Sequence, residues 1–316
     1  MDLHDIQGLV FHAYRGFPHA AYVLLTFEKH RPRQVRRWLA DLLAEGVIDS
    51  AKPDDDGPRR HPNVRVNVAL SASGLTAIGL HEEDRQTFPL TFLEGLGGEW
   101  KHLDPANPDP DTAIPDHRSR ILGDVAGDNR PFRWKWGYQP ETRVDGLLLI
   151  FANDEVILQT TAHGFIHHAV QLGAIGPKGA KILYGGFPRN NEPNREAFGF
   201  VDGISQPVLK GARGKLGKKD KRLATDEMED GEIVLAYRDN TRMLPRSPSV
   251  AADRDPHRVL RDVRDDPGMP PDPDPGLPPD PGTPPPTLPG HALTFIDYPA
   301  SRTETNRSWA SVLTDI

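Results

Sequence analysis

The stretch "HAAYVLLTFEKHRPRQVRRWLADLLAEG", residues 19–46, carries the pattern that decides the fold. Its first part, His19 to Phe27, is a short and nearly continuous apolar run, which is typical of a buried strand. The part that follows spaces its apolar residues at helical intervals, and Gly46 is placed to end the helix. The sequence therefore predicts a β-α unit at this position.

Two further segments repeat this pattern downstream. "NVRVNVAL" (Asn63 to Leu70) alternates like a strand, and Ser71 is placed to cap a short helix. "DGLLLIFA" (Asp145 to Ala152) predicts another buried strand, and Asn153 is placed to cap a helix of about five turns. The region from His81 to Trp136 is rich in Pro, Asp and Gly and is expected to form a long, mostly irregular segment that wraps over the first sheet. We call this segment the wrap. The β-α-β-α order at the start of the chain is typical of ferredoxin-like α+β folds.

The domain organisation predicted from these segments has three parts. Residues 1–150 are expected to form an N-terminal ferredoxin-like unit with its wrap, and residues 151–250 to begin a second, incomplete unit that ends in a strand at "GEIVLAYRDN". Residues 251–316 form a tail, because thirteen of the 32 prolines lie between Pro256 and Pro289. Such a composition favours extended polyproline II and cannot bury enough apolar surface to fold. We expect a disordered tail.

Composition excludes several classes of protein. The formal charge of -7 argues against a general nucleic-acid binder, which needs a basic excess to neutralise phosphates. The chain has no Cys, which excludes disulfides, iron–sulfur clusters and thiolate-ligated haem or zinc, and leaves 13 histidines as the soft ligands. Neither a signal peptide nor a membrane-spanning run is found, so a cytoplasmic location is expected.

One acidic residue stands out in "EAFGFVDGISQP", residues 196–207. Asp202 has no adjacent Lys or Arg, and its neighbours are apolar side chains and glycines: Phe198, Gly199, Phe200, Val201, Gly203 and Ile204. Apolar walls raise the pKa of a carboxyl and favour proton transfer. A D-G pair is first of all a turn, so the local pattern alone favours an Asx-turn without chemistry over a catalytic carboxylate.

A family resemblance favours the chemical reading. "GFVDG" matches the G-x-x-D-G motif of the dye-decolorising (DyP-type) haem peroxidases. "DIQGLVFHAYRGFPHAAYVLLTF", "VNVALSASGLTAIGL", "SRILGD", "GEIVLAYRDN" and "LPRSPSV" are similar to further landmarks of that family and follow in the same order. The motif alone is a weak signal, but the ordered set is specific, and it covers about residues 5 to 250.

The resemblance implies a fold, a cofactor and roles for residues. It implies ferredoxin-like sheet units of the dimeric α+β barrel type, b-type haem, hydrogen peroxide as oxidant, and dyes or phenolic compounds as small aromatic substrates. Asp202 takes the role of the distal acid–base residue, which moves a proton from the inner to the outer peroxide oxygen. Phe198, Gly199, Phe200, Val201, Gly203 and Ile204 take the cofactor-binding positions. No oligomeric state is implied.

The chain departs from the family after Val250. The proximal histidine that ligates iron and a distal arginine are expected downstream of the motif, and no matching segment follows it. His257 and His291, the last histidines, lie in or beside the tail, so the axial ligand is not assigned. We interpret the tail as a frameshifted reading of a longer gene or, alternatively, a divergent ending. A chain without these two residues is expected to bind haem weakly.

Two other patterns have simpler interpretations. His163 and His167 lie at helical i,i+4 spacing, but no third ligand accompanies them, so a solvated or packed helix face is favoured over a metal site. The basic run from Lys210 to Arg222 lacks interleaved aromatic residues and indicates a solvated loop.

Three hypotheses remain open from the sequence: a haem peroxidase, a truncated family member without activity because the proximal histidine and distal arginine are missing, and an interaction protein that uses the Pro-rich tail.

Overall fold

The computed structural model describes residues 3–4, 6–12, 14, 16–52, 58–98, 106, 113–186, 208–212, 227–235, 237–243, 248–251, 254 and 290–292. Contacts within the chain divide it into two units. The larger unit draws on residues 11–49, 59–191 and 307–316, and the smaller on residues 1–10, 50–58 and 192–306. Each unit is described by itself.

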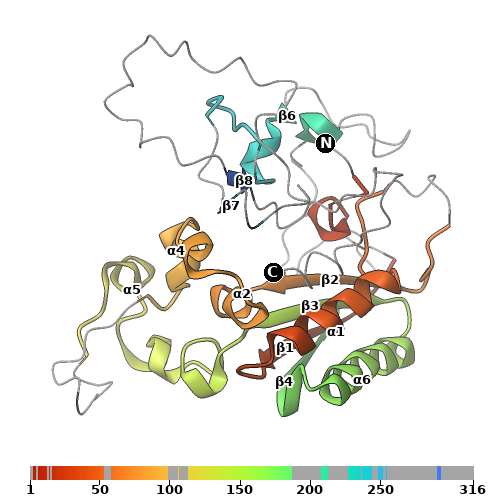
Figure 1. Ribbon diagram of the computed structural model, residues 1–316, viewed down its shortest axis with the longest axis horizontal. Helices are drawn as coiled ribbons and strands as arrows, with labels where there is room; N and C mark the ends of the chain where they lie inside the picture. Colours follow the sequence, from red (N-terminus) through yellow and green to blue (C-terminus); the bar gives the residue numbers. More distant parts are fainter. Residues whose placement is uncertain are drawn as a thin grey trace, which may run out of the picture. The chain divides into compact units, whose positions relative to one another are not determined.

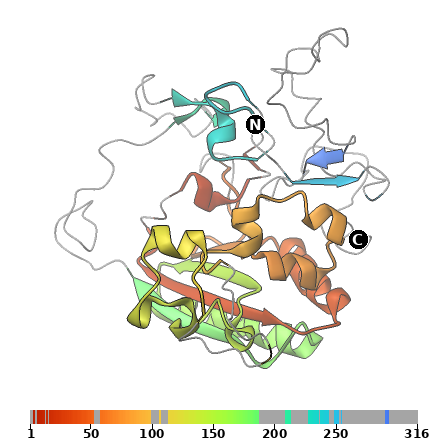
Figure 2. The ribbon, with the colours of Figure 1, turned by 90° about the vertical axis from the view of Figure 1, so that its left-hand side faces the viewer.

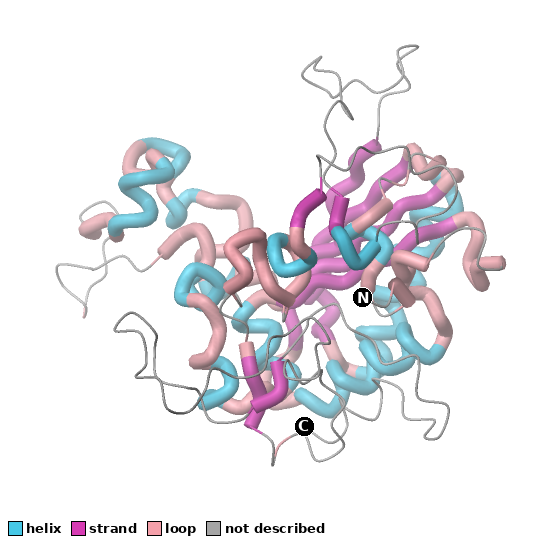
Figure 3. Tube along the Cα trace, turned by 90° about the horizontal axis from the view of Figure 1, so that it is seen from above, coloured by secondary structure: helices cyan, strands magenta, loops and turns pink. Residues whose placement is uncertain are grey.

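The larger unit is built on one four-stranded antiparallel sheet (Figures 1 and 3). Its strands are β1 (His19–Phe27), β2 (Val64–Leu70), β3 (Gly146–Ala152) and β4 (Ile175–Gly186), in the spatial order β2-β3-β1-β4. A helix follows β1 and another follows β3. This β-α-β-β-α-β connectivity is the ferredoxin-like topology, which confirms the predicted α+β fold class.

The pairing corrects the predicted domain boundary at residue 150. β3 pairs with both β1 and β2, and β4 pairs with β1, so the segment from 146 to 186 completes the first sheet instead of opening a second unit. A buried strand followed by a helix is compatible with either arrangement, because the local pattern does not say which edge a strand joins. The GFVDG stretch lies outside the described residues, and the boundary at residue 250 stays a prediction.

Two helices cover one face of this sheet (Figure 1). α1 (Pro32–Ala44) begins with Pro32 at its first position and ends just before Gly46, whose φ of 65° fits a helix stop. α6 (Glu155–Leu172) contacts α1 as well as β1, β3 and β4. The indole of Trp38 joins the two helices, because its Nε1 donates to the Phe165 carbonyl at 3.3 Å.

The cap of α6 differs from the prediction by one residue. The N-cap is Asp154, whose Oδ1 accepts from the backbone N–H groups of Val156 and Ile157 at 2.9 and 3.0 Å. Asn153 instead donates from its Nδ2 to Asn63 Oδ1 at 3.0 Å. A carboxylate is favoured at this position because it also carries negative charge to the positive end of the helix dipole.

The segment between β2 and β3, which includes the predicted wrap, contains several short helices, coloured orange to yellow in Figure 2. Ser71 caps the first of them, α2 (Ala72–Ile78), and accepts from the Gly74 backbone N–H at 3.2 Å, as predicted. The others are α3 (Glu82–Arg85), α4 (Leu90–Glu94), α5 (His117–Leu122), η2 (Gly127–Asn129), η3 (Pro131–Arg133) and η4 (Pro140–Thr142).

A buried carboxylate joins the wrap to the sheet. Asp145 immediately precedes β3, and its side chain is 1% exposed. One carboxylate oxygen accepts from the Phe27 backbone N–H at 2.8 Å, and the other accepts from Ser73 Oγ at 2.6 Å. Arg143 Nε lies 3.1 Å from both oxygens. Because these partners come from the end of β1, the start of α2 and the last residues of the wrap, Asp145 fixes three segments together.

The smaller unit contains short elements in its described residues. β5 (Val208–Leu209) pairs in parallel with β6 (Glu227–Met228), and β7 (Ser249–Ala251) pairs antiparallel with β8 (Gly290–Ala292). The remaining elements are η1 (Gly8–Val10), η5 (Lys210–Ala212) and η7 (Asp230–Glu232).

The predicted strand at "GEIVLAYRDN", residues 231–240, is wrong for its described residues. η7 runs into this segment, and the Gly231 N–H donates to the Arg238 carbonyl at 2.9 Å. That bond closes the segment into a loop, so its backbone groups pair locally instead of with a neighbouring strand. The predicted Pro-rich tail lies, apart from residues 251, 254 and 290–292, outside the described residues.

Candidate functional site

The residues predicted to carry the chemistry are not among those that the structure describes. Asp202 and the proposed haem-pocket residues Phe198, Gly199, Phe200, Val201, Gly203 and Ile204 all lie in the range 187–207, outside the described residues. Their assignment therefore stays a prediction.

A second buried polar cluster, around Tyr14 and Asp49, lies at the β2 edge of the sheet in the larger unit. Tyr14 is 6% exposed, and its hydroxyl donates to Asp49 Oδ2 at 2.9 Å. The same hydroxyl accepts from Asn67 Nδ2 at 3.0 Å. Asn67 belongs to β2, and the Asp49 backbone N–H donates to the Val66 carbonyl at 2.7 Å. The cluster therefore ties the segment before β1 to the edge strand.

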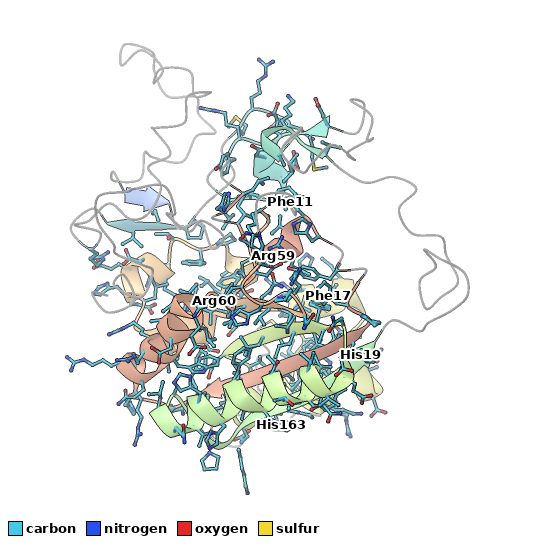
Figure 4. All side chains as sticks on the ribbon, turned by 90° about the vertical axis from the view of Figure 1, so that its right-hand side faces the viewer. Phe11, Phe17, His19, Arg59, Arg60 and His163 are labelled. Carbon is cyan, nitrogen blue, oxygen red and sulfur yellow. The ribbon has the colours of Figure 1, made fainter. Side chains whose placement is uncertain are left out.

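Two arginines complete the cluster. Arg59 Nη1 lies 2.6 Å from Asp49 Oδ1, and Arg65 Nε lies 3.7 Å from the same oxygen. The Arg65 guanidinium also stacks 4.5 Å from the ring centroid of Phe17. In Figure 4, Arg59 and Phe17 lie on the side of the sheet away from α6, which carries His163. The register agrees: Arg65 pairs with Phe151, which pairs in turn with Ala20, so these three side chains share one face of the sheet. Tyr14 packs with Ala20 and Phe151 on that face.

Burial controls protonation in this cluster. Burial raises the pKa of Tyr14, and the adjacent charge of Asp49 raises it further. Tyr14 is therefore a neutral phenol at ordinary pH and can act as a donor to Asp49. Burial also raises the pKa of the Asp49 carboxyl, while Arg59, the Tyr14 hydroxyl and Arg65 oppose that shift. Both Asp49 oxygens are engaged by protein donors, so the arrangement serves to position the chain.

Tyr14→Phe is expected to lower the free energy of unfolding by about 1–3 kcal/mol, because it removes a donor from buried Asp49 and an acceptor from buried Asn67. Urea unfolding followed by circular dichroism measures this loss. Tyr22→Phe is the matched control, since Tyr22 lies in β1 and is 36% exposed. Equal stability of the two variants would contradict a structural role for the Tyr14 hydroxyl.

Two of the histidines in α6 are exposed to solvent, and a third faces α1. His163 and His167 are exposed, and His163 Nε2 lies 3.5 Å from the Tyr184 hydroxyl. His168 instead faces α1, with its Nε2 3.3 Å from Asp41 Oδ2. Within the described ranges, no three His, Asp or Glu side chains gather as metal ligands. The exposure of His163 and His167 agrees with the predicted solvated helix face.

Sequence reasoning missed the Tyr14–Asp49 cluster. Asp49 stands among apolar residues in "GVIDSA", residues 46–51, which is the same kind of signal that drew attention to Asp202. Asp49 and Asn67 lie 35 and 53 residues from Tyr14 along the chain, so no local spacing connects the three residues.

Comparisons with known proteins support the fold. A dye-decolorising peroxidase solved in complex with 2,6-dimethoxyphenol matches 78% of this chain at 18% identity, with a TM-score of 0.52. The DyP-type peroxidase from Anabaena sp. matches 65% of the chain at 24% identity, with a TM-score of 0.48. No protein-family model and no curated protein matches the chain.

The chain spans less than half the length of these solved structures, 47% of the first and 40% of the second. Among the described helices, none combines the length and apolar character needed to cross a membrane. Identity this low carries information on fold alone, and the antiparallel sheet with its helices agrees with it. The chain therefore has, over the region that aligns, the fold of the dye-decolorising peroxidases.

Proposed function

We propose that the chain is a haem-dependent peroxidase of the DyP type, which reduces hydrogen peroxide and oxidises phenolic compounds or dyes. The observation that carries the proposal is the combination of a DyP-like fold at a TM-score of 0.52 with the "GFVDG" motif at residues 199–203. Neither signal is sufficient alone, because a fold hosts many functions and the motif is short.

The donor set of the chain is compatible with b-type haem. Peroxidase haem takes an axial histidine, and the chain has 13 histidines and no cysteine. His257 and His291 are the histidines that follow the motif, so they are the first candidates for that ligand. Bound haem would supply the iron that takes one oxygen atom from peroxide and the two electrons that reduce the peroxide.

The share of the chain in the reaction is proton transfer and exclusion of water. The Asp202 carboxylate is proposed to accept the proton of the inner peroxide oxygen and to return it to the outer oxygen, so that the outer oxygen leaves as water. Phe198, Phe200 and Ile204 are proposed to form apolar walls, which raise the pKa of Asp202 and keep bulk water away. Gly199 and Gly203 would allow the backbone to approach the cofactor closely.

Titration of the purified chain with haem tests the proposal. We expect a saturable Soret band at one haem per chain and peroxide-dependent oxidation of 2,6-dimethoxyphenol above the rate of the same concentration of free haem. His257→Ala and His291→Ala then identify the axial donor, because one of them should change the Soret position and the spin state. A chain that gives no Soret band beyond that of free haem would overturn the proposal and favour a family-like fold without peroxidase activity.

A further inference from the structure

An unusual share of exposed apolar side chains comes from one short stretch of the larger unit. Six large apolar residues between positions 90 and 125 are at least 40% exposed: Leu90, Leu96, Ile114, Ile121, Leu122 and Val125. Single exposed apolar side chains are normal on a soluble protein, but a cluster of them marks an interaction surface. We call this cluster the α4–α5 face.

An ion pair places the residues of the two helices on one surface. Leu90 and Glu94 lie four residues apart in α4 and therefore share one side of that helix. Arg118 and Leu122 share one side of α5 in the same way. Arg118 Nη2 lies 2.7 Å from Glu94 Oε2, so these two sides adjoin. Leu90 and Leu122 therefore belong to one continuous surface.

This surface is held in a defined shape. Asp116 caps α5 by accepting from the Ser119 N–H at 2.8 Å, and Gly123 ends the helix with a φ of 81°. Ser119 is fully buried, and its Oγ donates to the Gly97 carbonyl at 3.2 Å. Arg118 also donates to the Gly95 carbonyl. A surface that is already ordered loses little entropy when a partner binds.

The charges around the face fit a second copy of the chain. His117 and Arg120 are exposed on α5, and Asp128 is exposed shortly after it. A two-fold interface presents the same patch from both sides, so it needs both signs of charge on one patch. A lipid surface or a nucleic acid would instead require an excess of Lys and Arg. Together the six exposed side chains present apolar surface on the order of several hundred Å², an amount that suits the apolar centre of a standard interface.

We propose that the α4–α5 face is the interface of a homodimer in which two copies pack around a two-fold axis. The arrangement buries Ile121 and Leu122 of each copy against the other and places Arg120 of one copy opposite Asp128 of the other. The interface uses residues outside the proposed peroxidase site and does not depend on that proposed function.

Sedimentation of the full chain at micromolar concentrations tests the dimer. We expect a reversible dimer whose dissociation constant rises by roughly 100-fold or more in Ile121→Asp and in Leu122→Asp, since a buried charge at the centre of an interface is strongly unfavourable. Val156→Asp is the matched control, because Val156 is 71% exposed on α6, and this variant should remain dimeric. Far-ultraviolet circular dichroism checks that each variant is folded.

Because the chain has no cysteine, single thiols give an independent measurement. Among Leu96→Cys, Ile121→Cys and Leu122→Cys, at least one should form a disulfide-linked dimer on mild oxidation, and Val156→Cys should not. A chain that stays monomeric, a dimer that the aspartate variants leave unchanged, or cross-linking that is equal at Val156 would each overturn the proposal.

Discussion

Asp145→Ala is expected to lower the free energy of unfolding by about 3–5 kcal/mol, the usual effect of removing one partner from a buried ion pair. The substitution leaves Arg143 without its carboxylate and deprives the Phe27 N–H and the Ser73 hydroxyl of their acceptor. For a unit of this size the loss corresponds to a fall of roughly 6–20 °C in melting temperature. Thermal unfolding followed by circular dichroism measures it.

Asp154→Ala is the control for this variant. Asp154 is also an aspartate that accepts from backbone N–H groups, but it lies exposed at the start of α6. Loss of such a cap lowers stability by about 1 kcal/mol. If the two variants lost the same stability, Asp145 would be an ordinary cap and would not join three segments. Asp145→Asn should fall between them, because the amide keeps the shape but not the charge.

Asp202→Asn is expected to slow the reaction with peroxide by about 10²- to 10⁴-fold, the usual contribution of a positioned acid–base group. This expectation rests on the proposed function. The asparagine amide fills the same space, but its oxygen cannot take the proton of the inner peroxide oxygen. Stopped-flow absorbance of the haem-loaded protein after mixing with peroxide measures this step, separately from the later oxidation of the aromatic substrate.

Two controls make the Asp202 result interpretable. Asp154→Asn should leave the peroxide reaction unchanged, because the α6 cap lies away from the motif in sequence and belongs to the helix that covers the sheet. The Soret band of Asp202→Asn should match that of the wild type, which shows that haem is still held. Unchanged peroxide kinetics in the variant would instead leave the distal arginine expected for the family as the principal catalyst.

The local elements of the sheet could be predicted from sequence because their signals are local. The apolar run from His19 to Phe27 is β1, the alternating run before Ser71 is β2, and Ser71 caps α2. Each of these predictions depends on side chains within a few residues of one another. The predicted cap of α6 failed because Asn153 and Asp154 are both good caps, and only the contact of Asn153 with Asn63 decides between them.

Long-range arrangements could not be predicted in this way. Whether β3 opens a new unit or completes the first sheet depends on its pairing with β1 and β2, which the apolar pattern does not encode. The Tyr14–Asp49 cluster escaped for the same reason. Asp202 was found through its motif, and its surroundings remain a prediction because they lie outside the described residues.

The strand order of the sheet has a consequence for synthesis of the chain on the ribosome. β1 lies between β3 and β4, yet about 120 residues separate the end of β1 from the start of β3. At usual elongation rates the nascent chain exposes this apolar strand for roughly 6–24 s before a partner emerges. Pairing at such sequence separation is slow to form. We therefore expect a chaperone that shields β1 during this interval to raise the yield of folded chain, and we expect that yield to be sensitive to translation speed between residues 27 and 146.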